Sequence, residues 1–488
     1  GPLPGNLAAL ASELEPNELV PKIMTYVLSE GHDYWTLDAE FDDDDTSKYR
    51  DAEKRLETKA FRLGEDFAAS DHEISELGPS LFSNGGVPYC AAFGRGLAKG
   101  ADDMRVGWEQ LIDHLEQQPE AGKNFTVFGG FIEAVDSVDS TLAQELLNQC
   151  LRHPELRQVL VGLHPRGKFL EADLDRCMAL LDCPDIHPRM YGPILWHDAY
   201  QNLPQNRVLG LAERLLTQSN GDDVLLEALC MKLHGKSDSV DTLGSELRLV
   251  GLNAAIQRFQ RDYSDLGGTI DHRMNQVLGA ALRFEGNEAK KIELVDTIIA
   301  VIDEQHGYVH GFDKAIETIV GLMPKAFLNR LFDGTEEEQS RRLVFIRNEG
   351  LRRSPLANID TDVLIEWCRA KGDTGVWAAV AEGVSLWPKD GDQGPTSIPA
   401  PAIKLLEAAP NPEAILEKYA ERVAPTTLSG SIASVMQGRA NAVRELMKHK
   451  RADIRSAAET VSEMLAEWIE CAKLREQRRD EEREQRFE

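Results

Sequence analysis

Apolar residues recur along most of the chain at intervals of three and four, the spacing that places them on one face of an α-helix. The stripe is clearest near the carboxy terminus, where it contains Val443, Leu446, Met447, Ile454, Ala457, Ala458, Val461, Met464, Leu465 and Trp468. No segment sustains the period-two alternation of a half-buried strand. The pattern therefore predicts an all-α protein.

Glycine, proline and Asn-Gly signals separate these amphipathic segments at short intervals, as antiparallel helix hairpins require. Helices are expected over residues 7–14, 19–30, 46–70, 103–118, 140–151, 172–182, 205–218, 222–234, 245–262, 272–284, 288–304, 312–332, 335–348, 360–371, 375–386, 400–408, 412–422 and 431–449, followed by a long final helix. The runs at 125–135 and 156–163 are rich in β-branched or aromatic residues. Helix formers flank both, so we expect buried helical turns there.

Three stretches interrupt the helical pattern. Residues 36–50 form an acidic turn, and residues 387–401 are rich in proline and glycine, which cannot sustain a helix. Residues 78–100 combine glycines with aromatic residues and are expected to be irregular.

Helix pairs recur roughly every 30–45 residues, which is the range of helical-repeat proteins. The pairs are alike in shape but not in residue identity, so the repeats are degenerate. This pattern favours an extended α-solenoid over a compact bundle. We expect an acidic helical region over 1–150, central repeats over 151–386, the Pro/Gly-rich loop over 387–401, and further repeats with a charged last helix over 402–488.

The chain carries 82 acidic and 54 basic residues, a formal charge of −28. Residues 1–150 contain 29 of the acidic residues and 11 of the basic ones. Such a field repels phosphate backbones and anionic membranes, so nucleic-acid and membrane binding are disfavoured. It suits a basic protein partner, or it serves only to solvate the surface. No apolar run approaches the roughly 18 residues of a membrane span.

The seven cysteines lie at unrelated spacings without a CxxC pair, and most fall inside apolar helical segments. Free buried cysteines indicate a reducing compartment, so a cytoplasmic protein is expected. The first residues, Gly-Pro-Leu-Pro-Gly, lack an initiator methionine and look like a protease-cleavage scar. We therefore expect the sequence to be the carboxy-terminal part of a longer chain.

Two glycine-containing motifs fall short of nucleotide-binding sites. The run at 94–100 has Lys99 where a dinucleotide fingerprint needs its third glycine, and no strand precedes it. We expect a loop there, followed by a helix start at 101–103. The segment His-Gly-Lys-Ser at 234–237 lacks the earlier glycine of a phosphate loop, because that position is Cys230. We interpret it as a helix end with a glycine cap.

Candidate metal ligands are also incomplete. The four contiguous aspartates at 42–45 lack the alternating ligands of a calcium loop and predict a solvated turn. His306 and His310 have the i, i+4 spacing of a zinc-binding helix, but glycines follow both and the HExxH glutamate is missing. No GxSxG nucleophile motif occurs. We assign no catalytic, cofactor-binding or metal-binding residue, while a site assembled from dispersed residues stays open.

Basic residues gather in two places that would suit a partner. One cluster surrounds Phe345, and the other lies in the turn before the last helix. The predicted partner-binding residues are Arg341, Arg342, Arg347, Arg352 and Arg353 in the first cluster, and Lys450 and Arg451 in the second. The first cluster would bind an acidic partner or a phosphate backbone, or would pair with the acidic run at 336–338.

The carboxy-terminal helix pair carries a resemblance to known proteins. A basic turn at 449–451 precedes Asp453, the expected N-cap, and Arg455 follows one turn into the helix. An Asp-x-Arg turn of this kind closes HEAT-type helix pairs. Residues 431–488 resemble the HEAT-like carboxy-terminal regions of large bacterial proteins that carry an NTPase or effector domain and act in defence against phage. The resemblance implies a sensing or scaffolding role in a bacterial cytoplasm and transfers no catalytic residue.

Three functional hypotheses follow. The first is a non-enzymatic α-solenoid of degenerate HEAT-like helix hairpins, without a cofactor, that binds a phage protein or a cognate defence subunit. The second is a nucleic-acid-binding helical repeat that uses the cluster at 341–353. The third is a cryptic metal-dependent hydrolase around His306 and His310. The missing catalytic motifs favour the first hypothesis.

Overall fold

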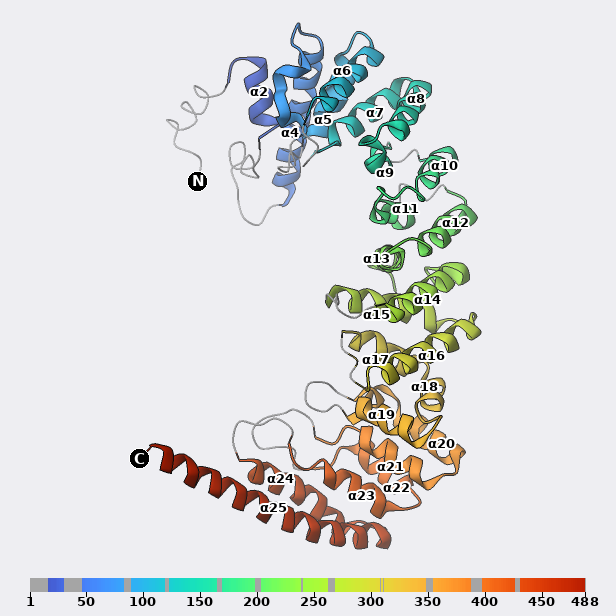
Figure 1. Cartoon of the computed structure of the whole chain (residues 1–488), viewed down its shortest axis with the longest axis vertical. Coiled ribbons are helices and arrows are strands. Elements are labelled where there is room, and N and C mark those ends of the chain that lie inside the picture. Colours follow the sequence, from blue (N-terminus) through green and yellow to red (C-terminus); the bar gives the residue numbers. More distant parts are fainter. Residues whose placement is uncertain are drawn as a thin grey trace. The chain divides into compact units, whose positions relative to one another are not determined.

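The computed structural model describes residues 16–29, 46–82, 89–118, 123–164, 169–197, 203–237, 240–261, 268–307, 309, 311–347, 354–387, 397–425 and 431–487 (Figure 1). Within these residues the chain forms helices and connecting segments and no strand, so the all-α prediction is confirmed. None of these helices is long and apolar enough to cross a membrane. The predicted helix at 7–14, the aspartates at 42–45 and most of the loop at 387–401 lie outside the described residues.

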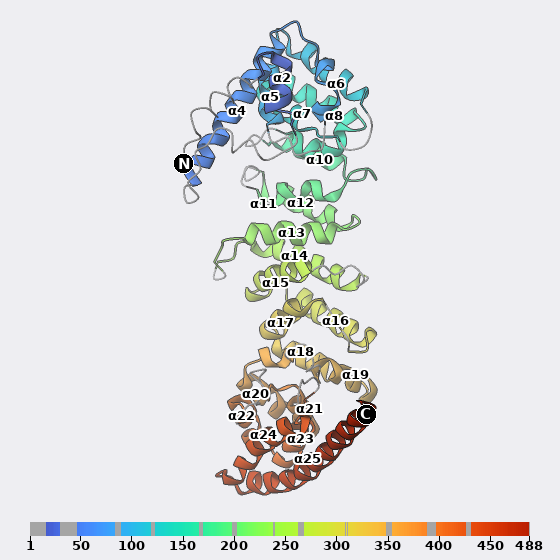
Figure 2. The ribbon, with the colours of Figure 1, turned by 90° about the vertical axis from the view of Figure 1, so that its left-hand side faces the viewer.

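The chain divides into two compact units, Gly1–Val224 and Leu225–Glu488, which we call unit 1 and unit 2. The division falls inside helix α13 (Gly221–Leu233). The changes of region at 150 and 386, which composition and loop signals predict, stay predictions. Figure 2 shows the helices of both units in a second view.

In the described residues of unit 1, the 23-residue helix α4 accompanies helices of 13 residues or fewer. Its helices before α13 are α2 (Leu19–Tyr26), α4 (Thr46–Ala68), η1 (Ile74–Phe82), α5 (Cys90–Gly100), α6 (Met104–Glu116), α7 (Thr126–Val138), α8 (Ser140–Arg152), η2 (Leu156–Val159), α9 (Leu160–Leu163), α10 (Glu171–Ala179), η3 (Pro188–Tyr191), α11 (Gly192–Trp196) and α12 (Gln205–Leu216), where η marks a 3₁₀ helix. The predicted helical turns at 125–135 and 156–163 are confirmed as α7 and as η2 with α9.

Unit 2 continues with longer helices. They are α14 (Gly244–Gln260), α15 (Gly268–Arg283), α16 (Glu288–Glu304), α17 (Asp313–Leu322), α18 (Pro324–Leu331), α19 (Glu336–Arg347), η6 (Pro355–Asn358), α20 (Thr361–Lys371), α21 (Thr374–Gly383), α22 (Ala400–Ala408), α23 (Pro412–Glu421), α24 (Ile432–Arg444), η7 (Glu445–Lys448) and α25 (Ala452–Phe487). The single helix predicted over 312–332 is two helices. Pro324 begins α18 because its ring suits a first helical position and it has no N–H to continue α17.

Helix α5 of unit 1 crosses both α4 and α7 with their backbones in contact. A Cβ atom at Gly96 would collide with the Phe61 carbonyl of α4, and one at Gly130 of α7 would collide with the Ala91 carbonyl of α5. The prediction of irregular structure up to residue 100, with a helix starting at 101–103, is therefore wrong for residues 90–100. Glycine usually signals a loop, but here it permits close packing between helices.

Neighbouring and next-but-one helices pack on one another in unit 2. Thus α14 contacts α16, α15 contacts α17, α21 contacts α23 and α23 contacts α25 (Figures 1 and 2). The apolar stripe predicted for the last helix supplies its buried face, which includes Ile454, Ala458, Val461 and Leu465. Burial of such stripes is the main source of stability for stacked helices.

Polar side chains join helices whose residues lie 28 to 45 positions apart along the chain. In unit 1 they include Arg157 with Asp185, 28 residues apart, and Trp108 with Gln149, 41 apart. In unit 2 they include Trp367 with Asn329, Lys404 with Asp362 and Ser431 with Glu476, which are 38, 42 and 45 residues apart. These separations resemble the predicted spacing of the helix pairs.

Candidate functional site

The first predicted basic cluster is described only in part. Arg341 is half-buried and Arg342 is buried, both on α19. The side chain of Arg347 and the residues Arg352 and Arg353 lie outside the described residues. The described part of the cluster therefore presents no fully exposed cation.

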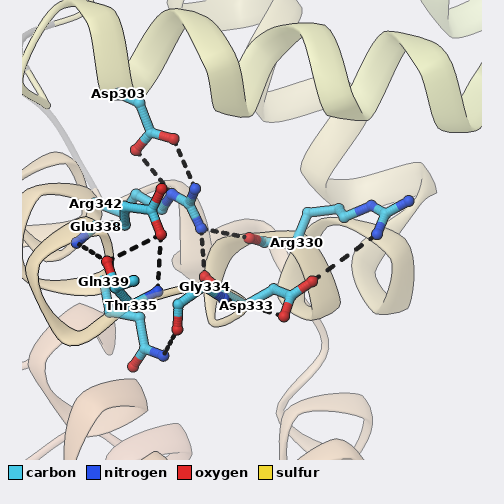
Figure 3. Close-up of polar contacts among 8 residues, drawn as sticks. All are labelled: Asp303, Arg330, Asp333, Gly334, Thr335, Glu338, Gln339 and Arg342. Atoms are coloured by element: carbon cyan, nitrogen blue, oxygen red, sulfur yellow. Dashed lines mark hydrogen bonds and ion pairs between the residues drawn. The ribbon is translucent and has the colours of Figure 1, made fainter.

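Arg342 ties α19 to α16 and to the end of α18 (Figure 3). Its Nε and Nη2 donate to the two carboxylate oxygens of Asp303 at 2.8 and 2.6 Å. Its Nη1 donates to the carbonyls of Arg330 and Asp333 at 2.9 and 2.6 Å, at the end of α18. The hydrogen bonds with Asp303 raise the pKa of Arg342. The structure places this predicted partner-binding residue in an internal joint.

The acidic run at 336–338 caps the start of α19 (Figure 3). The N–H of Thr335 donates to Glu338 Oε2 at 2.7 Å, and the N–H of Glu338 donates to Thr335 Oγ1 at 3.3 Å. This reciprocal arrangement is a capping box. The backbone hydrogen bond from Thr335 lowers the pKa of Glu338. The hydrogen bonds of Glu338 thus serve the helix start, and the nearby charges of Arg342 and Arg341 lower its pKa further.

The second predicted site, Lys450 and Arg451, lies in the turn before α25. Arg451 Nη2 donates to Asp453 Oδ2 at 2.5 Å, and Arg451 Nη1 donates to the Glu407 carbonyl of α22. Arg455 donates to two carbonyls of the same turn at 2.9 Å each. The hydrogen bonds from Arg451 lower the pKa of Asp453, which lies in the first turn of α25 and not before it as predicted. Lys450 is the exposed member of this pair.

A cavity of about 400 Å³ in unit 2 lies between the end of α13, helix α15 and helix α17. Asn275, Gly279 and Arg283 line it at steps of four residues, so one face of α15 forms its floor. Lys236 follows α13 at one side, and Thr318 of α17 lies at the other. We call it the unit 2 cavity.

The lining of the unit 2 cavity combines positive charge with exposed apolar groups. Lys236 and Arg283 are exposed, and no aspartate or glutamate is among the lining residues that the structure describes. Val240 and Leu322 also line the cavity and are 60% and 38% exposed. They are two of the five exposed large hydrophobic residues in the described part of unit 2, so exposed apolar surface is concentrated here.

Sequence reasoning missed this cavity because its walls come from three separate segments. The interpretation of 234–237 as a helix end with a glycine cap is confirmed, since α13 ends at Leu233 and Gly235 has a φ of 70°. That local interpretation says nothing of α15 and α17, which complete the site. The signal in the sequence was Gly279, because glycine destabilises the middle of an amphipathic helix and its presence there calls for another reason.

Unit 1 contains a larger cavity, of about 670 Å³, lined by α5, α7 and α9. Arg95 lies between Glu57 and Glu133, with nitrogen–oxygen distances of 2.5 and 3.1 Å. Lys123 Nζ binds both carboxylate oxygens of Glu155 at 2.5 and 2.7 Å. Both cationic groups that line the cavity are thus neutralised within the unit, which gives the site no clear preference for a ligand charge.

His164 lines the unit 1 cavity and belongs to a buried polar network. Its Nδ1 donates to the Leu160 carbonyl at 2.8 Å, and its Nε2 accepts from Arg176 at 3.2 Å. Arg176 also donates to Asp173 Oδ1 at 2.7 Å. This bonding pattern requires the neutral imidazole, and burial lowers the pKa of His164 to about 4. The network joins α8, α9 and α10 from within.

The remaining candidate chemistry is sparse in the part of the chain that the structure describes. His306 follows the end of α16 with a φ of 51°, and His310 lies outside the described residues. The described residues contain no group of three or more metal-ligating side chains. The burial predicted for the cysteines holds for Cys150, Cys177 and Cys368, and Cys90 is buried as well, whereas Cys183 and Cys230 are half-buried and Cys471 is exposed. Burial raises the pKa of Cys90 and of Cys150 to about 12. These two thiols are therefore protonated and inert at neutral pH.

Comparison with known proteins gives no relative. No family model, no curated protein and no solved structure matches the chain.

Proposed function

We propose that the protein is a non-enzymatic α-solenoid scaffold or sensor of HEAT-like helix hairpins that binds a protein partner in a bacterial defence system. The observation that carries the proposal is the ladder of polar side-chain bonds between helices, whose partners lie 28 to 45 residues apart in the sequence. Stacked helix hairpins produce such a ladder because each repeat contacts only its neighbours.

The character of the exposed surface supports a binding role. Stacked hairpins bury one side of each helix and leave a series of helix faces available to a partner. In unit 2 the exposed apolar residues Val240 and Leu322 lie beside exposed cations in one cavity. Such a mixture is typical of protein-binding surfaces, which combine an apolar centre with polar groups. It requires no reacting group.

Size-exclusion chromatography with light scattering tests the proposal. The full chain would be mixed, one at a time, with purified phage proteins and with the products of the genes that neighbour its own. We expect one of these proteins to co-elute with the chain as a complex of defined mass, and serum albumin not to do so. Failure of all these proteins to form a complex would contradict the proposed function.

A further inference from the structure

We propose that the unit 2 cavity binds an extended acidic segment of the protein partner, in which carboxylate side chains alternate with aliphatic ones. The inference rests on the proposed function and names the chemistry by which the partner is recognised. Three features of the cavity support it: its charge, its backbone-binding groups and its apolar rim.

The cavity carries positive charge in a strongly acidic protein. The formal charge of the chain is −28, yet the exposed Lys236 lines the cavity and no described lining residue is acidic. A partner segment with carboxylates would find complementary charge here and repulsion over much of the remaining surface. The cavity thus selects an acidic segment over a basic one.

The floor of the cavity suits a peptide backbone. The Thr318 hydroxyl donates to Asn275 Oδ1, which orients the amide and leaves its Nδ2 to donate to a peptide carbonyl. Beside it, a Cβ atom at Gly279 would meet only Thr318 Cγ2, at 4.0 Å. No neighbouring helix requires this glycine, although glycine destabilises a helix interior relative to alanine. Its presence keeps the floor open for close approach of a backbone.

The rim supplies apolar contacts on both sides of the floor. Val240 follows α13 and Leu322 ends α17, and both are exposed. In an extended peptide, successive side chains point in opposite directions. A segment that alternates acidic and aliphatic residues can therefore present a carboxylate to Lys236 and aliphatic groups to the rim.

Fluorescence anisotropy on the full chain tests the inference. The probes are fluorescein-labelled peptides that alternate aspartate or glutamate with leucine or valine, and matched peptides with lysine at every acidic position. We expect the acidic peptides to bind and the lysine peptides not to bind. Lys236→Glu should weaken binding about tenfold, and Gly279→Met should abolish it by filling the floor. Binding should also weaken as salt is raised.

Two matched variants control for charge and for the glycine substitution. Lys325→Glu makes the same charge change on the exposed start of α18, outside the cavity. Gly210→Met makes the same steric change in α12, where a Cβ atom meets nothing within 4 Å. Both variants should bind the acidic peptides as the wild type does. Circular dichroism should show that all four variants are folded.

Equal binding of acidic and lysine peptides, or unchanged binding by folded Gly279→Met, would overturn the inference. The outcome is separable from that of the proposed function. If a protein partner is found and both cavity variants bind it normally, the scaffold proposal stands and the cavity inference fails. If the acidic peptides bind as expected but no protein partner forms a complex, the cavity inference stands and the scaffold proposal fails.

Discussion

Arginine side chains join neighbouring helix pairs by donating to carbonyl groups at helix ends. Arg214 reaches the Met178 carbonyl in the last turn of α10 at 3.0 Å, and Arg422 reaches the Val384 carbonyl after α21 at 2.7 Å. Arg342 does the same at the end of α18. A carbonyl oxygen can accept two hydrogen bonds, so these guanidinium groups add a donor at each helix end, and the Met178 and Arg330 carbonyls accept a backbone N–H as well. Basic residues that look like ligand-binding groups in the sequence can thus hold neighbouring helices together inside the protein.

Arg342→Ala should destabilise unit 2 by about 3 kcal/mol, because it removes the two hydrogen bonds to the Asp303 carboxylate and those to the Arg330 and Asp333 carbonyls in a largely buried place. The side chains of Arg342 and Asp303 are only 9% and 25% exposed. Arg330→Ala is the matched control in the same network. Its side chain is 45% exposed, so we expect a loss below about 1 kcal/mol. Urea denaturation and hydrogen exchange of α18 and α19 would measure the loss of stability in each variant. Equal losses in the two variants would contradict the internal role of Arg342.

His164 should make unit 1 sensitive to mild acid. Its pKa falls from the ordinary 6.5 to about 4 because burial disfavours the charged ring. The unfolded chain then binds more protons than the folded chain between these values, so stability is full above pH 6.5 and is lost as the pH falls toward 4. This pKa shift contributes up to about 3 kcal/mol to the free energy of unfolding. Urea denaturation across this pH range measures it.

Two substitutions test the assignment of this acid sensitivity. His164→Gln should flatten the pH profile of unit 1 because it removes the titrating ring. His272→Gln, at an exposed position on α15 of unit 2, should leave the profile as it is in the wild type. If His164→Gln retained the full loss of stability between pH 6.5 and 4, another group would have to be responsible.

At the scale of elements, the apolar periodicity predicts helices closely. The predictions at 288–304 and 400–408 match α16 and α22 residue for residue. The prediction fails for α5 (Cys90–Gly100), whose glycines resemble loop signals in a single sequence. Their role is visible only when α4 and α7 are placed beside them, because the close approach belongs to the pair of helices and not to one of them.

The candidate site could not be predicted for a related reason. The residues of the unit 2 cavity lie between positions 233 and 322 and come from three elements. Each segment has an adequate local interpretation, for example as a helix end at Leu233 or as an amphipathic helix around Gly279. The charge and shape of the cavity arise from their juxtaposition, which periodicity does not encode. The basic clusters, by contrast, were visible in sequence, but their burial and bonding were not.

The adjacent glycines of α7 give a test of close helix packing. A Cβ atom at Gly130 would collide with the Ala91 carbonyl, which is backbone and cannot rotate away, so Gly130→Ala should cost about 3 kcal/mol. At Gly129 the nearest atom is the Gly162 carbonyl oxygen at 3.7 Å, so Gly129→Ala should stabilise the helix by about 0.5–1 kcal/mol. Hydrogen exchange of α5 and α7 should show opposite shifts. Equal effects would show that the crossing is not limited by the backbone.

At the scale of the whole molecule, charge separates the two binding hypotheses. The formal charge is −28, so a nucleic-acid complex would have to overcome long-range repulsion. Of the cluster proposed for such binding, Arg342 already makes its hydrogen bonds with Asp303 and two carbonyls. A phosphate contact by Arg342 would have to replace these hydrogen bonds. An acidic peptide faces the same overall field, but the exposed Lys236 of the unit 2 cavity acts at short range, where screening matters less.

We therefore expect no retardation of duplex DNA or single-stranded RNA in a gel shift at about 0.15 M salt. The affinity of any complex that forms at low salt should fall steeply as salt is raised, because such a complex would consist of phosphate contacts alone. Arg347→Glu tests whether the predicted cluster contributes, and Lys325→Glu is the control with the same charge change on α18. A complex that persists at this salt concentration and is abolished only by Arg347→Glu would favour a nucleic-acid-binding repeat over a protein scaffold. Loss of a weak complex with either variant would instead indicate nonspecific attraction.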